Sequence, residues 1–196
     1  MNILIVSDQE SPYLWDYFDK DKFRHIDLVI SCGDLKASYL SFLVTMIPVP
    51  LLYVHGNHDT RYLENPPEGC ICIEDEVFEY KGVKIAGLGG SMEYVGGPFQ
   101  YTDAIMSKRS KKLIKACNKK GGLDILVTHA PTLGLGDGED QCHKGFQAFY
   151  DIYSTFNPKY HIHGHQHLNY TAKSQRVHNY NNITIINGFN YHVLNY

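Results

Sequence analysis

Short apolar runs alternate with helix-like patterns along this chain, and the alternation predicts an α/β fold. Runs rich in β-branched residues are about four to eight residues long, which is typical of buried strands. The expected strands cover residues 2–7, 27–32, 51–55, 71–74, 77–81, 83–88, 124–129, 159–163, 176–179 and 183–187. Apolar positions with a period of about 3.6 predict helices at residues 12–19, 36–46, 102–119 and 145–156. A tight hairpin turn is expected in YKGVK, where Gly82 supplies a positive φ.

Length and composition indicate one intracellular domain. The chain has 196 residues and no linker, so we expect a single domain over residues 1–196. No run approaches the ~20 apolar residues that cross a membrane, so we expect no membrane partner. The start, MNILIVSD, has no basic segment and reaches Asp8 too early for a signal peptide. The five cysteines form no secreted disulfide pattern, and we therefore expect a cytoplasmic protein.

The charge of the chain does not favour nucleic acid as a partner. The formal net charge is −3, which gives no overall attraction to phosphate backbones. Cationic residues do gather in SKRSKKLIKACNKK, residues 107–120, on one face of an expected helix. A solvated helix face explains them without a ligand, and a phosphate-rich partner is the alternative. The oligomeric state stays open.

Several expected strands end in side chains that can bind a metal ion. One such ending is common, because Asp, Asn and Gly also form turns. Here ILIVSDQE, LVISCGD, LLYVHGNHD, ILVTHAP and YHIHGHQH follow one another in the chain, and turn formation does not explain the whole series. The side chains at these strand ends are Asp8, Glu10, Asp34, Asn57, His58, Asp59, His129, His165 and His167.

The segment YHIHGHQH cannot be one straight strand that binds an ion with every histidine. Its histidines, at 161, 163, 165 and 167, would span roughly 20 Å at about 3.3 Å per residue. The chain must turn, and Gly164 is where it can. The segment therefore divides into a strand and a loop that presents His165 and His167. We expect His161 and His163 to be strand residues or residues that support the metal ligands.

These motifs, in this order, resemble those of the calcineurin-like metallophosphoesterase superfamily, which run D-x-H, G-D, G-N-H-[DE], H and G-H-x-H. The match extends from Asp8 to His167. THAPTLGLGD, with HKGF before HIHGHQH, is similar to a small cytosolic subgroup related to the fetal-brain metallophosphoesterases. The resemblance implies a four-layer α/β/β/α sandwich of two mixed sheets flanked by helices. It also implies two divalent metal ions at the carboxyl ends of the strands.

The resemblance assigns a role to each residue of the motifs. One ion would take Asp8, the residue at position 10, Asp34 and His167. The other would take Asp34, Asn57, His129 and His165, so that Asp34 bridges the two ions. A mixed set of oxygen and nitrogen ligands suits Mn²⁺ best in our interpretation, with Fe, Zn²⁺, Ni²⁺ or Mg²⁺ as alternatives.

The implied reaction is hydrolysis of a phosphate ester by a hydroxide that bridges the two ions. His58 corresponds to a histidine that binds no metal, contacts the phosphate with Asn57 and protonates the leaving group. Asp59 would orient His58. His143, in the Gly-rich loop 131–145, is either a substrate contact or a surface histidine.

Position 10 departs from the family pattern, because Glu10 stands where a histidine ligand is expected. Glu10 would bind the first ion, reach it through water, or be a loop carboxylate. If it binds, three carboxylates and a hydroxide balance two divalent cations, and the site is formally neutral. We therefore hypothesise a preference for Mn²⁺ and for phosphodiesters over dianionic monoesters.

Two classes of function compete with this phosphodiesterase interpretation. A binding or scaffold module can retain the fold with a degenerate first metal site, as the retromer subunit with this fold does. His58 favours an enzyme, because a scaffold needs no histidine for proton transfer. A nuclease is disfavoured by the acidic charge balance. The sequence predicts a small phosphate ester as substrate without naming which ester.

Overall fold

The computed structural model describes residues 1–169 and 175–196 and contains two large sheets. The first has the order β13-β1-β2-β3-β4, with β13 antiparallel to β1 and the other pairs parallel. Its strands are β1 (Asn2–Ser7), β2 (Leu28–Ser31), β3 (Leu51–Tyr53), β4 (Ile71–Cys72) and β13 (Asn190–Asn195). Parallel strands end at one edge of a sheet, so the turns after β1, β2 and β3 lie together.

The second sheet has the order β11-β12-β10-β9-β6-β5, with parallel inner strands and an antiparallel strand at each edge. Its strands are β5 (Val77–Tyr80), β6 (Val83–Leu88), β9 (Ile125–Thr128), β10 (Tyr160–His163), β11 (Val177–Tyr180) and β12 (Ile183–Asn187). A short separate pair joins β7 (Ser91–Met92) to β8 (Gln100–Tyr101). Both large sheets are therefore mixed, as expected.

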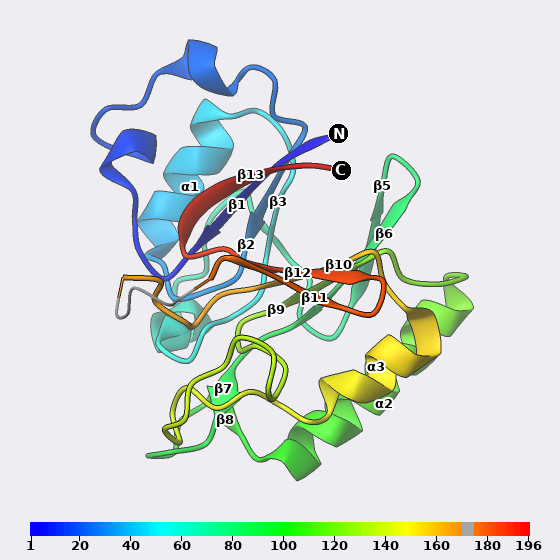
Figure 1. Cartoon of the computed structure of the whole chain (residues 1–196). Helices are drawn as coiled ribbons and strands as arrows, with labels where there is room; N and C mark the ends of the chain where they lie inside the picture. Colours follow the sequence, from blue (N-terminus) through cyan, green and yellow to red (C-terminus); the bar gives the residue numbers. More distant parts are fainter. Residues whose placement is uncertain (170–174) are drawn as a thin grey trace.

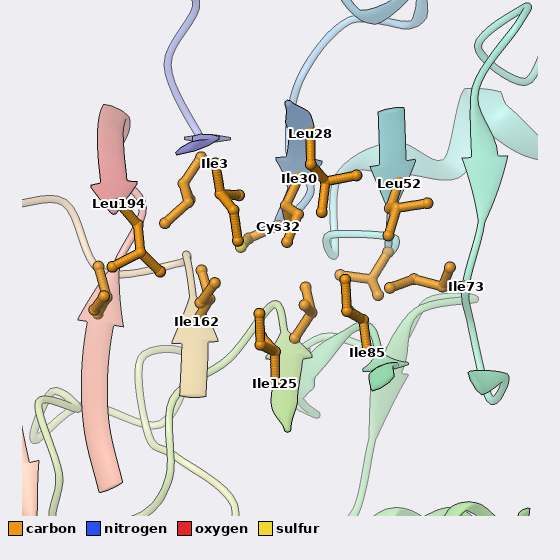
Figure 2. Close-up of a cluster of buried hydrophobic side chains, with 14 of the residues drawn as sticks. Ile3, Leu28, Ile30, Cys32, Leu52, Ile73, Ile85, Ile125, Ile162 and Leu194 are labelled. Carbon is orange, nitrogen blue, oxygen red and sulfur yellow. The ribbon is translucent and has the colours of Figure 1, made fainter. Parts of the chain in front are cut away.

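The two sheets pack face to face, and helices cover their outer faces (Figure 1). Helix α1 (Ala37–Met46) lies on the first sheet, and α2 (Asp103–Lys119) and α3 (Phe149–Phe156) lie on the second. Figure 2 shows Ile3, Ile30 and Leu52 of one sheet pointing toward Ile85, Ile125 and Ile162 of the other. The expected four-layer α/β/β/α sandwich is confirmed.

Alternation along β1 shows how the sequence specifies these layers. Ile3 and Ile5 belong to the core between the sheets, whereas Leu4 and Val6 belong to the core under α1. Successive strand residues point to opposite faces, so a strand that is apolar at every position is covered on both sides. A nearly continuous apolar run is therefore the expected signature of a strand in the middle of this sandwich.

The predicted strands and most helices are confirmed, with one shorter helix. Helix α3 begins at Phe149 rather than at residue 145. Two backbone N–H groups of the missing turn bond to acidic side chains elsewhere: Gly145 donates to Asp137, and Ala148 donates to Asp103. These contacts bind the segment to the preceding loop and to α2, and they replace the first helical turn.

The predicted helix at 12–19 is wrong. The structure has one 3₁₀ turn there, Pro12–Leu14, and a second one, Lys20–Phe23, directly after the range. The ring of Trp15 stacks on Tyr39 at 5.2 Å between centroids, and Phe18 stacks on Phe23 at 5.3 Å. Aromatic residues have modest helix propensity. Their packing onto α1 and onto one another decides the path of this segment.

Three strands were not predicted from the sequence, namely β7, β8 and β13. Strand β13 has only Leu194 as a buried residue, so it carries little of the apolar signal that marks a strand. It forms because its backbone pairs with β1 from Asn2↔Asn195 to Ser7↔Asn190. The predicted turn between β5 and β6 is confirmed, with positive φ at Lys81 and Gly82.

Helix α2 has the expected two faces. Met106, Leu113 and Cys117 are buried, and the lysines of the segment are exposed. Arg109 differs from these lysines, because it forms ion pairs with Glu74 and Asp75 and is only 13% exposed. None of the helices in the described ranges is both long and apolar enough to cross a membrane.

His161 belongs to a buried hydrogen-bond chain beneath α3 rather than to a metal site. The Thr128 hydroxyl donates to the Ala130 carbonyl, so it accepts from Nε2 of His161, 2.7 Å away. The hydroxyl of Tyr153 lies 2.5 Å from Nδ1 of His161 and donates to it. Burial holds the pKa of His161 well below its usual value, and the ring is neutral.

This buried ring predicts acid sensitivity. The unfolded chain binds a proton at position 161 near pH 6.5, and the folded chain does not, so stability is complete above that pH and is lost as pH falls. We expect His161→Phe to reduce the dependence of the unfolding free energy on pH below about pH 6 by up to about 1.4 kcal/mol per pH unit. Urea denaturation at several pH values measures this, and equal slopes for both proteins would contradict it.

Candidate metal centre

Side chains from four strand ends meet at one edge of the sandwich. Asp8 follows β1, Asp34 follows β2, His129 follows β9 and His165 follows β10. One ligand atom from each lies within 4.8 Å of the others. Two of these residues come from each sheet, so the group lies across the interface between the sheets. The sequence predicted all four as metal ligands.

Three of these residues have a backbone that L-residues rarely adopt. Asp8 has φ 64°, Asp34 has φ 57° and His165 has φ 67°. Such conformations cost on the order of 1–3 kcal/mol each and gather at functional sites. The sequence placed the turn of YHIHGHQH at Gly164, but the positive φ occurs one residue later, at His165. Gly164 is needed for space, because a Cβ there would lie 2.0 Å from Oγ of Ser7.

Gly164→Ala is expected to destabilise the fold by about 1–3 kcal/mol, because the new methyl group must displace Ser7 and Asp8 in a packed region. Chemical denaturation measures this cost. Gly97→Ala is the matched control, since its Cβ would meet only the flexible side chain of Gln100, at 3.3 Å, and we expect a change within about 0.5 kcal/mol. Equal stabilities of the two variants would contradict the close approach.

The hydrogen bonds of His129 fix which nitrogen faces the group. Nδ1 lies 2.7 Å from the carbonyl oxygen of Cys32 and donates to it. Nε2 faces Oδ1 of Asn57 at 2.9 Å and Oδ2 of Asp34 at 3.4 Å. In a neutral imidazole these are three acceptor atoms turned toward one another, which is repulsive without a positive charge between them. This arrangement fits a metal cation.

The pKa values of Asp8 and His129 indicate that this group of residues favours a positive charge among them. Burial alone would lower the pKa of His129, but the charge of Asp34 and its hydrogen bond outweigh burial and raise it. Burial raises the pKa of Asp8 to about 6. A divalent cation would keep Asp8 ionised and leave His129 neutral, which is the state in which both are ligands.

His165 is oriented in the same way as His129. Its Nε2 lies 2.6 Å from the carbonyl oxygen of Cys142, to which it donates, so Nδ1 is the nitrogen with a free lone pair. Its backbone N–H donates to both carboxylate oxygens of Asp8, each at 2.9 Å. Burial lowers the pKa of His165 to about 3, so the ring is neutral and suited to a metal.

The other predicted ligands, except Glu10, adjoin this group. Asn57 contacts it through His129, and the Nδ2 of Asn57 donates to the hydroxyl of Tyr94 at 3.3 Å. Nε2 of His167 lies 3.9 Å from Oδ1 of Asp8. The set of carboxylate, amide and imidazole groups is the mixture of ligands that divalent first-row metals accept.

The GNHD loop is held beside the metal ligands by backbone contacts. The backbone N–H of His58 donates to Oδ1 of Asp34 at 2.8 Å. The carboxylate of Asp59 accepts from the N–H groups of Gly56 at 2.7 Å and Asp34 at 2.9 Å. Asp59 therefore joins two loops through their backbones. We predicted from the sequence that it orients His58, and that role stays a prediction.

A comparison with protein families is decisive here. The model for calcineurin-like phosphoesterases matches residues 1–169. The chain belongs to this family. Two crystal structures share the fold at 15% sequence identity. For the first, the TM-score is 0.68, and the alignment covers 98% of this chain and 94% of the other chain. For the second, TT1561 of Thermus thermophilus, the TM-score is 0.64, and the alignment covers 96% of this chain and 88% of the other chain.

A curated relative supports the expected subgroup of the family. UPF0046 protein T07D4.2 of Caenorhabditis elegans is 30% identical over 103 residues, which is 51% of this chain. The aligned stretch spans only 24% of that protein. As a calcineurin-like phosphoesterase, the chain has a candidate site for the divalent metals that the family typically binds.

Glu10, at the family's histidine position, is outside the group of four converging ligands and contacts Lys36 instead. One carboxylate oxygen accepts from the backbone N–H of Lys36 at 3.2 Å, and the other lies 3.1 Å from Nζ of Lys36. The contact joins the loop after β1 to the start of α1. The role of Glu10 as a ligand of the first ion stays a prediction. In this structure Lys36 balances its charge.

His143 lies in a second group with metal-binding potential, together with Asp140 and Cys142. Nδ1 of His143 lies 2.8 Å from the Asp140 carboxylate. Its ring is 5.3 Å from that of His165, so it stands at the edge of the metal group, where a substrate could meet it. Its role as a substrate contact stays a prediction.

Sequence reasoning missed two groups that support the ligands, Tyr94 and the carbonyl of Cys142. Tyr94 lies in the loop between β7 and β8, and its hydroxyl accepts from Asn57. The same loop is joined to the Gly-rich loop by a bond from Gln141 to the Glu93 carbonyl. Tyr94 follows only the two-residue strand β7, and Cys142 lies within the Gly-rich loop, so neither follows the longer apolar runs that identified the ligands.

Proposed function

We propose that this protein is a metal-dependent phosphoesterase that hydrolyses a small phosphate ester, with a phosphodiester as the preferred substrate. The observation that supports the proposal best is the convergence of Asp34, Asn57 and His129. Their acceptor atoms face one another beside a histidine, His58, that is outside the group of metal ligands. The family is one of phosphoric ester hydrolases, which agrees with this assignment.

Two divalent ions are proposed as cofactors, with Mn²⁺ as the preferred metal. Asp8, Glu10, Asp34 and His167 would hold one ion, and Asp34, Asn57, His129 and His165 the other. When bound, the ions supply Lewis acidity toward the phosphoryl oxygens and lower the pKa of the attacking water. The chain contributes His165, which is neutral, and His129, whose Nδ1 bond to the Cys32 carbonyl turns Nε2 toward the site.

His58 is proposed to act as general acid. Its imidazole would give a proton to the oxygen of the departing alcohol as the phosphorus–oxygen bond breaks. The backbone N–H of His58 donates to the carboxylate of Asp34, which is a proposed metal ligand. This bond fixes the backbone of His58 beside the proposed ions. A cavity of about 460 Å³ adjoins His58 and offers room for the departing group.

The cellular setting is also a proposal. We place the protein in the cytoplasm, and the five cysteines, all of them free, agree with a reducing compartment. A small ester, rather than nucleic acid or a membrane, is the proposed partner. The net charge of −3 supports the exclusion of nucleic acid.

Metal content per chain and hydrolysis of generic aryl phosphate esters test the proposal. Protein stripped of metal and reloaded with Mn²⁺ is expected to bind two ions and to cleave the diester faster than the monoester. Asn57→Ala is expected to lose turnover, because it removes a ligand of one ion. No turnover with any divalent ion would contradict the enzyme and favour the scaffold interpretation. Glu10→His tests the charge argument for position 10, and we expect it to change both the metal preference and the ratio of diester to monoester hydrolysis. If both stay unchanged, the charge argument is wrong.

A further inference from the structure

A buried ion pair, Glu74 with Arg109, has no role in the proposed chemistry. Glu74 lies between β4 and β5, Arg109 lies in α2, and their side chains are only 17% and 13% exposed. Arg109 also donates to Asp75 and to the carbonyl oxygen of Gly89, each at 3.0 Å. Its guanidinium lies over the ring of Tyr101, 4.5 Å from the centroid. These contacts fix both charged groups in a part of the fold with little access to water.

The carboxylate of Glu74 joins two turns, one from each large sheet. Its Oε2 accepts from the backbone N–H of His55 and faces Nδ1 of the His55 ring, each at 3.3 Å. Its Oε1 accepts from the backbone N–H of Gly89 at 2.9 Å. His55 follows β3 of the first sheet, and Gly89 follows β6 of the second. A Cβ on Gly89 would lie only 2.4 Å from the carbonyl oxygen of His55, so the two turns are in close contact.

The first of these turns leads into the GNHD loop. The carbonyl of His55 accepts from the backbone N–H of Gly90 at 2.7 Å, and its ring stacks on Phe99 with 4.3 Å between centroids. With the bonds to Glu74, both backbone polar groups and the ring of His55 are fixed. Asn57, a proposed ligand, follows two residues later. Its position therefore depends on how His55 is held.

The second turn adjoins His129, a proposed ligand of the same ion. The backbone N–H of His129 donates to the carbonyl oxygen of Leu88 at 3.3 Å, and Gly89 is the next residue. Oδ1 of Asn57 and Nε2 of His129 lie 2.9 Å apart although they follow strands of different sheets. Glu74 therefore binds next to both members of this pair.

We infer that the Glu74–Arg109 pair positions the two ligands that face each other across the sheets, and so shapes the site of one ion. These ligands are Asn57 and His129. The inference deepens the proposed function and rests on it. Burial alone would raise the pKa of Glu74, but its bond with His55 and the charge of Arg109 outweigh burial and lower it. The ionised carboxylate accepts stronger hydrogen bonds from the two turns than a neutral group would, and Arg109 is the cation that keeps it ionised.

Calorimetry with Mn²⁺ on metal-stripped protein tests this inference. We expect Arg109→Met to weaken one of the two binding steps about 10- to 100-fold, because the ligands of that ion lose their fixed spacing. The other step is expected to stay unchanged. Glu74→Gln should act in the same way, and Arg109→Lys should have a smaller effect, because lysine keeps the charge but not the forked guanidinium.

Leu113→Ala is the matched control. Leu113 lies one turn after Arg109 on α2 and is fully buried, and the change leaves a cavity under the same helix. We expect both Leu113→Ala and Arg109→Met to lower the urea midpoint of unfolding, and only Arg109→Met to weaken metal binding. The comparison separates the position of the ligands from the general stability of the fold.

Hydrogen exchange in the metal-free protein gives a readout that needs neither metal nor turnover. The N–H groups of Gly56, which follows His55, and of Gly90, which donates to it, are both hydrogen-bonded. We expect Arg109→Met to speed their exchange about 10-fold or more, because the two turns open more often. Leu113→Ala should leave the exchange of these two groups unchanged.

If the wild-type protein binds Mn²⁺, an unchanged affinity in Arg109→Met and Glu74→Gln, or an equal loss in Leu113→Ala, would overturn the inference and leave the proposed function intact. If the wild-type protein binds no metal, faster exchange in Arg109→Met alone would support the fixed spacing and refute the proposed metal site. Equal exchange in the two variants would then refute the inference and the proposed function together.

Discussion

Asp34→Asn is expected to lower metal-dependent hydrolysis by about 10³-fold or more and to reduce the metal content of the chain. Asp34 is the residue that would bridge the two ions, and an amide in its place contributes no negative charge to hold them together. The loss of several kcal/mol of transition-state stabilisation by the ions corresponds to such a factor. The substitution also removes the carboxylate that faces Nε2 of His129 at 3.4 Å.

Metal analysis and steady-state kinetics on the same preparation measure both effects. Asp21→Asn is the control, since it makes an equal chemical change at an exposed ion pair with Arg24. Circular dichroism should show that Asp34→Asn is folded, because an asparagine can still accept from the N–H of His58. Full activity with one ion per chain would contradict the bridging role.

His58→Ala is expected to lower kcat by about 10²- to 10⁴-fold for esters of poorly acidic alcohols, while the bound metal stays unchanged. A general acid matters most when the leaving oxygen is basic. For a nitrophenyl ester, whose leaving group departs as a stable anion, the loss should be much smaller. The ratio of these two losses is therefore the signature of proton donation rather than of metal binding.

A series of diesters with alcohols of rising pKa measures this signature. In the wild-type protein the rate should depend weakly on the alcohol pKa, and in His58→Ala it should fall steeply. His58→Gln keeps a polar side chain that can contact phosphate, so it separates substrate contact from proton transfer. A uniform loss across the series in both variants would contradict the acid role and leave His58 as a phosphate contact only.

The gathering of polar side chains at one edge of the sandwich was predicted well because of where strand ends fall. Asp8, Asp34, His129 and His165 each come within three residues of the end of a buried strand, and parallel strands bring such positions to one edge. The convergence of these side chains could thus be expected from the sequence, whereas their roles as metal ligands are implied by the family resemblance and stay predictions.

Other parts of the site depend on contacts that leave no local pattern. The partner of Glu10 is Lys36, which is far away in sequence and meets it only because α1 begins next to the loop after β1. Tyr94 contacts Asn57 from a loop between two very short strands. Strand β13 is nearly all polar or half-exposed, and the segment before α1 folds through aromatic stacking. Periodicity reports the burial of one regular face, and none of these contacts follows such a period.

The two pairs of ligands come from opposite sheets, and this gives metal binding a mechanical consequence. Separation of the sheets would pull Asp8 and Asp34 away from His129 and His165, so the ions cannot remain bound to a sandwich that has opened. Each ion of the proposed pair would then act as a clamp, and the stabilisation would grow with the free metal concentration, to about 2.7 kcal/mol at 100 times Kd. If the proposed ions bind, the lifetime of the folded chain would be tied to the local supply of metal.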